Sequence, residues 1–164
     1  MPRIARKNLP PAGIFHVTTR GAGQIFVYLD DHDHRYFDTQ MHEAMDAFDL
    51  KLHAWCQMKN HYHVLVEGRR DDVSRAMHRI NFRHAQRFNE RWDRSGHLWG
   101  DRFALWVIRD DEHYERAVPY MLANPVRAGI CADAVDWRWS GPRRCSDQLR
   151  RLRSPSARWF QGTR

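Results

Sequence analysis

The stretch from Leu50 to Gly68 restricts the possible folds more than any other part of the chain. It holds two runs typical of β-strands, residues 50–58 and 61–68, with only Lys59 and Asn60 between them. A connection of two residues joins antiparallel strands in a hairpin, and asparagine tolerates the left-handed backbone angles that tight turns use. We therefore expect a hairpin here, and the remaining elements must be arranged around it.

The segments on either side of the hairpin alternate between strand and helix patterns. Residues 13–21 are rich in β-branched and aromatic side chains and predict a strand. Apolar residues at helical spacing predict helices over about 31–48 and 71–92, and residues 94–110 predict a loop and another strand. A final helix is expected from near 111 to 124, because the residue before a proline is steered away from helical angles.

The resulting order, β-α-β-β-α-β-α, contains the split βαβ pattern of ferredoxin-like folds. We predict an α+β fold with a ferredoxin-like antiparallel sheet and helices packed on one of its faces. A chain of 164 residues is the size of one domain with a single core. We assign this domain to residues 1–140 and an Arg-rich tail to residues 141–164.

The net charge of the chain lies in its C-terminal segment. Residues 138–164 contain eight arginines, no lysine and one acid, so the other 19 basic and 19 acidic side chains of the chain's 27 and 20 cancel. Such a tail favours a polyanionic partner, with nucleic acid first; the alternative is a solvated tail that aids solubility. Three cysteines without a CxxC pair indicate reduced thiols. With no apolar run long enough for a membrane span, we expect a cytoplasmic, nucleoid-associated protein.

Two pairs of histidines have the same spacing, and eleven histidines make roughly one such pair expected by chance. His32 and His34 lie among aspartates at a predicted helix start, where side chains two apart point in different directions. We interpret them as part of an acidic, solvated helix cap. His61 and His63 lie on a predicted strand, where residues two apart share a face. Their imidazoles are therefore able to converge on one divalent metal ion.

A third donor and a nucleophile are available near the end of the last predicted helix. Tyr120 and Asn124 are four residues apart and share one helix face. The alternative is ordinary packing of the tyrosine with Asn124 as a helix cap, and spacing alone favours it. Tyr114 is a rival nucleophile, but six residues from Tyr120 it points to the opposite face. Pro119 removes a helical hydrogen bond, so we expect a kink or restart there.

Four motifs in this order, "HVTTRG", "MKNHYHVLVE", "GHLWGDRF" and "YMLANPVRAG", resemble those of the REP-associated tyrosine transposases. These belong to the single-tyrosine transposases of the HUH nuclease superfamily, and the resemblance spans about residues 13–140. It implies the HUH nuclease fold. The "WGDRF" segment departs from the family's more usual Trp-Gln/Glu-x-Arg pattern, which puts DNA affinity or loop geometry at that loop in question.

The resemblance also implies roles for individual residues. His61 and His63 match the family's metal ligands for Mg²⁺ or Mn²⁺, Tyr120 matches its nucleophile, and Asn124 matches a ligand or orienting group. The family cleaves and rejoins single-stranded DNA through a 5′-phosphotyrosine with a free 3′-hydroxyl, and its REP-associated members recognise hairpins formed by palindromic repeats. Two other functions stay open: a non-catalytic single-stranded nucleic-acid-binding module, and a replication-initiation HUH nuclease.

Several arginines are candidates for DNA contacts. Arg20 and Arg102 lie in the family-like motifs near strand ends. A basic ridge on the long helix, spaced every four residues, is suited to a phosphate backbone and consists of Arg75, Arg79, Arg83, Arg87 and Arg91. The equal alternative is a solvated face that pairs with nearby acids. Trp99 is a candidate for base stacking or for the core, and the sequence leaves monomer and homodimer open.

Overall fold

The computed structural model describes residues 8–141, and within them the chain forms one five-stranded sheet in the order β4-β1-β3-β2-β5. Every pair of neighbouring strands is antiparallel. The strands are β1 (Ala12–Arg20), β2 (Lys51–Gln57), β3 (His61–Arg69), β4 (Ala104–Ile108) and β5 (Ser140–Gly141). The order β4-β1-β3-β2 is that of the split βαβ fold, so the predicted ferredoxin-like α+β class is confirmed.

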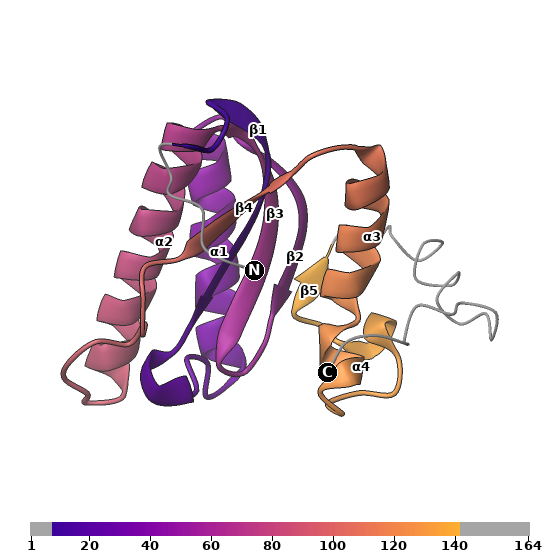
Figure 1. The fold of residues 1–164 in the computed structure, drawn as a ribbon. Coiled ribbons are helices and arrows are strands. Elements are labelled where there is room, and N and C mark those ends of the chain that lie inside the picture. Colours follow the sequence, from indigo (N-terminus) through magenta and orange to yellow (C-terminus); the bar gives the residue numbers. More distant parts are fainter. Residues whose placement is uncertain (1–7, 142–164) are drawn as a thin grey trace.

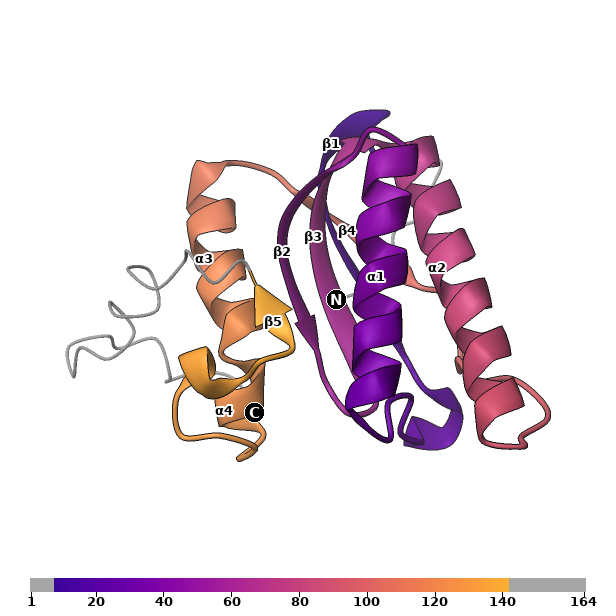
Figure 2. The same ribbon diagram turned by 180° about the vertical axis from the view of Figure 1, so that it is seen from behind.

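The helices cover both faces of the sheet. They are α1 (Asp31–Ala47), α2 (Arg70–Arg91), α3 (Asp111–Leu122) and α4 (Asn124–Arg127), with short 3₁₀ turns η2 (Ala22–Gln24) and η3 (Ala134–Asp136). Figures 1 and 2 show α1 and α2 on one side of the sheet and α3 and α4 on the other. The expectation that the helices lie on one face was therefore wrong.

The strands explain why both faces need a cover. Successive side chains of a strand point to opposite faces, and on β3 both sets include apolar residues: Val64 and Val66 join the core under α1 and α2, whereas Leu65 joins a second core. That second core is completed by Val118 and Met121 of α3. Burying apolar surface on each face is favourable, so the last helix packs against the side that α1 and α2 leave open.

The predicted hairpin is present, with Met58 donating its backbone N–H to the carbonyl of His61 at 2.8 Å. Helix α3 continues through Pro119 to Leu122 as one helix instead of restarting there. Helix α4, with Pro125 near its start, was not predicted separately, since four residues are too few to show a period. Strand β5 was not predicted either, because it is two residues long and exists only through its pairing with β2.

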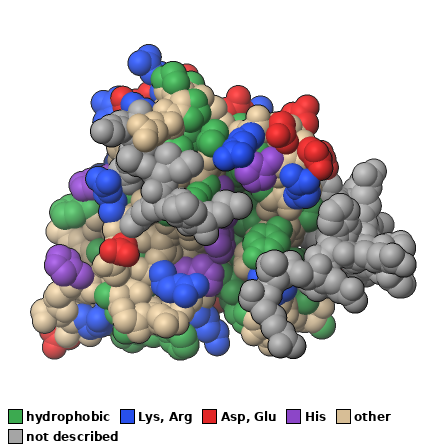
Figure 3. Space-filling model, viewed as in Figure 1, with side chains coloured by type: hydrophobic (Ala, Val, Ile, Leu, Met, Phe, Trp, Pro, Cys, Tyr) green, Lys and Arg blue, Asp and Glu red, His purple; other side chains and the backbone are tan. Residues whose placement is uncertain are grey.

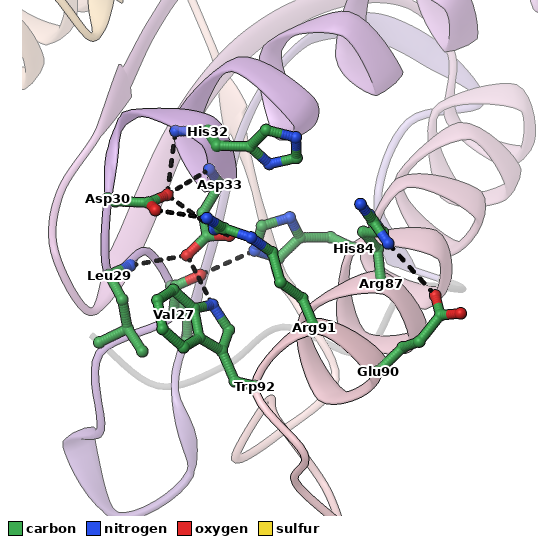
Figure 4. A network of polar contacts seen from close by, with 10 residues as sticks. All are labelled: Val27, Leu29, Asp30, His32, Asp33, His84, Arg87, Glu90, Arg91 and Trp92. Atoms are coloured by element: carbon green, nitrogen blue, oxygen red, sulfur yellow. Dashed lines mark hydrogen bonds and ion pairs between the residues drawn. The ribbon is translucent and has the colours of Figure 1, made fainter.

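Asp30 caps the N-terminus of α1, as the cluster of acids there suggested. Its carboxylate accepts hydrogen bonds from the backbone N–H groups of His32 and Asp33 (Figure 4). The guanidinium of Arg91 on α2 pairs with Asp33 at 2.6 Å and with Asp30 at 2.5 Å, so the cap also joins the two helices. Burial of the Asp33 side chain to 4% exposure shows that this cap is not a solvated one.

His34 also departs from the solvated-cap interpretation. Its ring stacks between Tyr28, with centroids 4.3 Å apart, and Trp139, with centroids 4.7 Å apart. Its Nδ1 lies 3.0 Å from Oε1 of the buried Gln57. Burial lowers the pKa of His34 to about 4, so it is a neutral core residue at pH 7, whereas His32 is exposed.

No helix among residues 8–141 combines the length and apolar character needed to cross a membrane. The N-terminal seven residues and most of the predicted Arg-rich tail, residues 142–164, lie outside the described residues. Arg138, the first arginine of the basic segment, pairs with Asp31 at 2.7 Å.

Candidate active site

The histidine pair of β3 faces α3, on the side of the sheet opposite α1 and α2. The rings of His61 and His63 lie with centroids 5.0 Å apart and nearly perpendicular, at 86°. Tyr62 between them points to the other face, where it is fully buried and donates its hydroxyl to Oδ1 of Asn81 at 2.9 Å. Strand geometry thus brings the two imidazoles together, as the spacing predicted.

Each of the two rings has its Nδ1 held by a neighbouring side chain. His61 Nδ1 lies 2.7 Å from Oδ1 of Asn60, and His63 Nδ1 lies 2.9 Å from Nε2 of His16. Within residues 8–141 no hydrogen bond engages the Nε2 of either ring. Two ε-nitrogens are therefore left for a ligand on this face. Histidine ligands of metal ions commonly have the other ring nitrogen held in this way.

The surroundings keep both imidazoles neutral at pH 7. Burial, with a smaller contribution from Arg20, lowers the pKa of His61 to about 4. Burial also lowers the pKa of His63 well below its usual value, helped by His16, His61, Arg20 and Arg127. Neutral imidazole is the form that binds metals, so the two rings are suited to ligate a divalent metal ion; its identity as Mg²⁺ or Mn²⁺ stays a prediction.

Among the described residues, no group of three or more His, Cys, Asp or Glu side chains is arranged to hold a metal ion. A third metal ligand of these types is therefore absent from this part of the chain. The side-chain amide of Asn124 donates to the carbonyl of Met121 at 2.8 Å and to that of Tyr120 at 3.5 Å. It therefore caps the end of α3, as the alternative held. Because the amide nitrogen makes these contacts, the Asn124 oxygen is left as an acceptor, and its metal role stays a prediction.

Tyr120 is 58% exposed, and the guanidinium of Arg127 lies 4.2 Å from the centre of its ring. The same arginine is close enough to His63 to lower its pKa. Arg127 therefore packs on the predicted nucleophile and lies within electrostatic range of His63, and sequence reasoning missed it. Its place in the quoted "ANPVRAG" segment was the available signal.

Tyr114 has a different environment. Its hydroxyl lies 3.0 Å from His53 Nδ1, and His53 Nε2 lies 2.8 Å from a carboxylate oxygen of Glu67. Glu67 is four residues from His63 on β3, roughly 13 Å along the strand. The rival tyrosine is thus held to the sheet at a distance from the histidine pair.

The predicted DNA-binding arginines fall into two groups. Arg20 lies opposite His61 in the pairing of β1 with β3, and Arg102 is exposed in the segment before β4. The ridge lies on α2, across the sheet from the histidines, and most of it is paired. Its contacts are Arg75 with Asp72, Arg83 with Glu43 and Gln40, Arg87 with Glu90, and Arg91 with Asp30 and Asp33.

These local ion pairs agree with the alternative interpretation of the ridge, a solvated helix face whose arginines pair with nearby acids. A DNA role for Arg75, Arg79 and Arg83 stays a prediction. Trp99 belongs with the core: it packs against the first apolar cluster and donates its indole N–H to the carbonyl of Asn81 at 3.0 Å. Figure 3 shows histidine side chains along the line where the sheet and α3 meet, beside apolar side chains.

Comparison with known proteins agrees with this architecture. The chain is 24% identical over 148 residues to a Haemophilus influenzae protein named as a candidate REP-associated tyrosine transposase, covering 82% of each chain. Its fold is similar to that of a REP-associated tyrosine transposase solved bound to a REP hairpin, with a TM-score of 0.71 and 20% identity over 90% of this chain and 86% of that one.

A family model for IS200-like transposases matches residues 15–121, which run from β1 into α3 and include the histidine pair and Tyr120. The match covers well over half of the chain. The chain therefore belongs to the IS200-like transposase family, a family of DNA-cleaving enzymes.

Proposed function

We propose that this chain cleaves and rejoins single-stranded or hairpin DNA through a 5′-phosphotyrosine on Tyr120, with a divalent metal bound by His61 and His63. The observation that carries the proposal is the pair of neutral imidazoles whose δ-nitrogens are both held, leaving two ε-nitrogens on one face. Membership of a transposase family supports the reaction class.

His61 and His63 would hold the Mg²⁺ or Mn²⁺, with the Asn124 side-chain oxygen as the proposed third protein ligand. When bound, the ion would polarise a non-bridging oxygen of the scissile phosphate. The remaining ligands would come from water and from the DNA itself, as is usual for Mg²⁺.

Tyr120 supplies the nucleophile. Its oxygen forms a bond to phosphorus as the bond from phosphorus to the 3′-oxygen breaks, and the 3′-oxygen takes a proton from solvent to leave as a hydroxyl. The tyrosine proton passes to solvent, which its 58% exposed side chain can reach. The phosphotyrosine ester retains the energy of the broken linkage, so a 3′-hydroxyl can reverse the step and rejoin a strand.

Arg127 and Arg20 are proposed to supply positive charge near the histidine pair. Both contribute to the lowered pKa of His63, which supports placing their charges close to that ring. Negative charge on the phosphate oxygens grows during such a transfer, and fixed cations stabilise it. Arg102 is proposed to contact the DNA outside the reacting group.

Hairpin DNA is the proposed partner, because the solved protein of similar fold is bound to a REP hairpin and the Haemophilus influenzae relative carries the REP-associated name. Palindromic repeats that fold into hairpins are accordingly the substrate to test first.

The test is to incubate the protein with Mn²⁺ and a labelled hairpin oligonucleotide, and to look for a protein–DNA adduct that survives denaturant. Tyr120→Phe should form none. Tyr114→Phe is the matched control on the same helix and should form the adduct, since its hydroxyl is turned to His53. An adduct with Tyr120→Phe would refute the nucleophile.

Replacing both histidines with alanine should abolish cleavage, and cleavage in that variant would refute the metal site. DNA binding at full strength without any cleavage or metal dependence would instead favour a non-catalytic nucleic-acid-binding module.

A further inference from the structure

His16 lies beside the histidine pair and belongs to no part of the reaction described so far. It is on β1, the strand between β3 and β4, where it is opposite Leu65 on one side and Trp106 on the other. Its ring centroid is 5.1 Å from that of His63, and its Nε2 is 2.9 Å from His63 Nδ1. Pairing on both edges of β1 fixes its backbone, so the sheet sets the position from which the His16 side chain reaches His63.

One proton must lie between these two ring nitrogens for the contact to be a hydrogen bond. If His63 Nδ1 donates, its Nε2 keeps a lone pair and can bind a metal. If His16 Nε2 donates instead, the neutral His63 ring carries its proton on Nε2 and cannot ligate from that atom. The direction of this one hydrogen bond therefore decides whether His63 is a ligand.

The neighbouring ligand shows which direction suits the site. Asn60 presents Oδ1 to His61 Nδ1 at 2.7 Å, and a carbonyl oxygen can only accept. His61 is thereby held with its proton on Nδ1 and its lone pair on Nε2. To ligate through its own ε-nitrogen, His63 needs the same arrangement, and only an acceptor at the His16 position gives it.

We propose that His16 is a positioning residue that accepts a hydrogen bond from His63 Nδ1 and so keeps the His63 ε-nitrogen available to a divalent cation. His16 itself then carries its proton on Nδ1. This inference rests on the proposed function for the identity of the metal ion. It does not require that the protein cleaves DNA. Losing such an outer partner of a metal ligand typically weakens metal binding by about 10- to 100-fold.

The matched pair of variants is His16→Gln and His16→Leu. Glutamine places a carbonyl oxygen near the position of Nε2 and keeps the acceptor, whereas leucine fills similar space without one. Mn²⁺ binding to the DNA-free protein, followed by the electron paramagnetic resonance of free Mn²⁺, should be within about threefold of the unmodified protein for glutamine. For leucine it should be about 10- to 100-fold weaker.

A second measurement separates this role from simple packing. Nitrogen NMR of the metal-free protein should show the His63 proton on Nδ1 in the unmodified protein and in His16→Gln, with the proton moving toward Nε2 in His16→Leu. Equal Mn²⁺ affinity in the leucine variant, no Mn²⁺ binding by the unmodified protein, or a His63 proton on Nε2 would each overturn the proposal. Binding and tautomer as expected without any DNA adduct would refute the proposed reaction and leave the role of His16 standing.

Discussion

Replacing Tyr62 with phenylalanine should lower the stability of the fold without lowering the rate of DNA cleavage. Tyr62 lies between the two histidines in sequence, yet its ring is fully buried on the opposite face and its hydroxyl donates to Asn81 at 2.9 Å. The variant loses one neutral hydrogen bond, and the Asn81 oxygen, on a side chain only 9% exposed, loses its donor. Together these effects should cost about 1–3 kcal/mol of unfolding free energy, or roughly 3–10 °C in Tm.

Urea unfolding gives the free energy, and a double-mutant cycle with Asn81→Leu isolates the pair. In the double variant the buried oxygen is gone as well, so the loss should be smaller than the sum of the two single losses. Adduct formation with Mn²⁺ and a hairpin should stay within about twofold of the unmodified protein at a temperature where both are folded. A folded Tyr62→Phe protein that formed no adduct would refute the separation of the two strand faces on which the site is built.

Three further outcomes are expected. Arg127→Leu should slow adduct formation about 10- to 100-fold, because a charge-assisted contact is worth about 1.5–3 kcal/mol. Arg127→Lys keeps the charge and should slow it less. Equal rates for Arg127→Leu and the unmodified protein in a single-turnover gel assay would remove Arg127 from the site. The unfolded chain protonates His84 near pH 6.5 but the folded chain only at about 4. The unfolding free energy should therefore fall as the pH drops through that window, and urea titrations should show a shallower fall in His84→Gln. Truncation after Gly141 keeps β5 and the buried Trp139. If the removed tail contacts phosphates, the truncation should weaken DNA binding and flatten its salt dependence. An unchanged salt slope would leave the tail a solubility role.

Local pattern was sufficient for the order of the helices and strands from β1 to α3 and for the placement of the histidine pair. The two-residue connection predicted the β2–β3 hairpin, and the apolar periods predicted α1 and α2 to within a few residues. The period of two along β3 also placed His61 and His63 on one face, with Tyr62 on the other. These features follow from backbone geometry within a few residues, so they are readable from a single sequence.

The contacts between residues far apart in the chain were decided by the tertiary structure alone. His16 meets His63, 47 residues away, because β1 pairs with β3. His34, expected in solvent, is buried because Trp139 returns from the other end of the chain to stack on it.

The sequence likewise did not predict the side of the sheet on which α3 packs. The apolar face of a helix can pack on either face of a sheet, and α3 covers the face that α1 and α2 leave open. The sequence by itself thus determined which side chains share a face. The partners that these side chains contact depended on strand pairing and on the burial of apolar surface from distant segments. The free energies of both arise only when the whole domain is assembled.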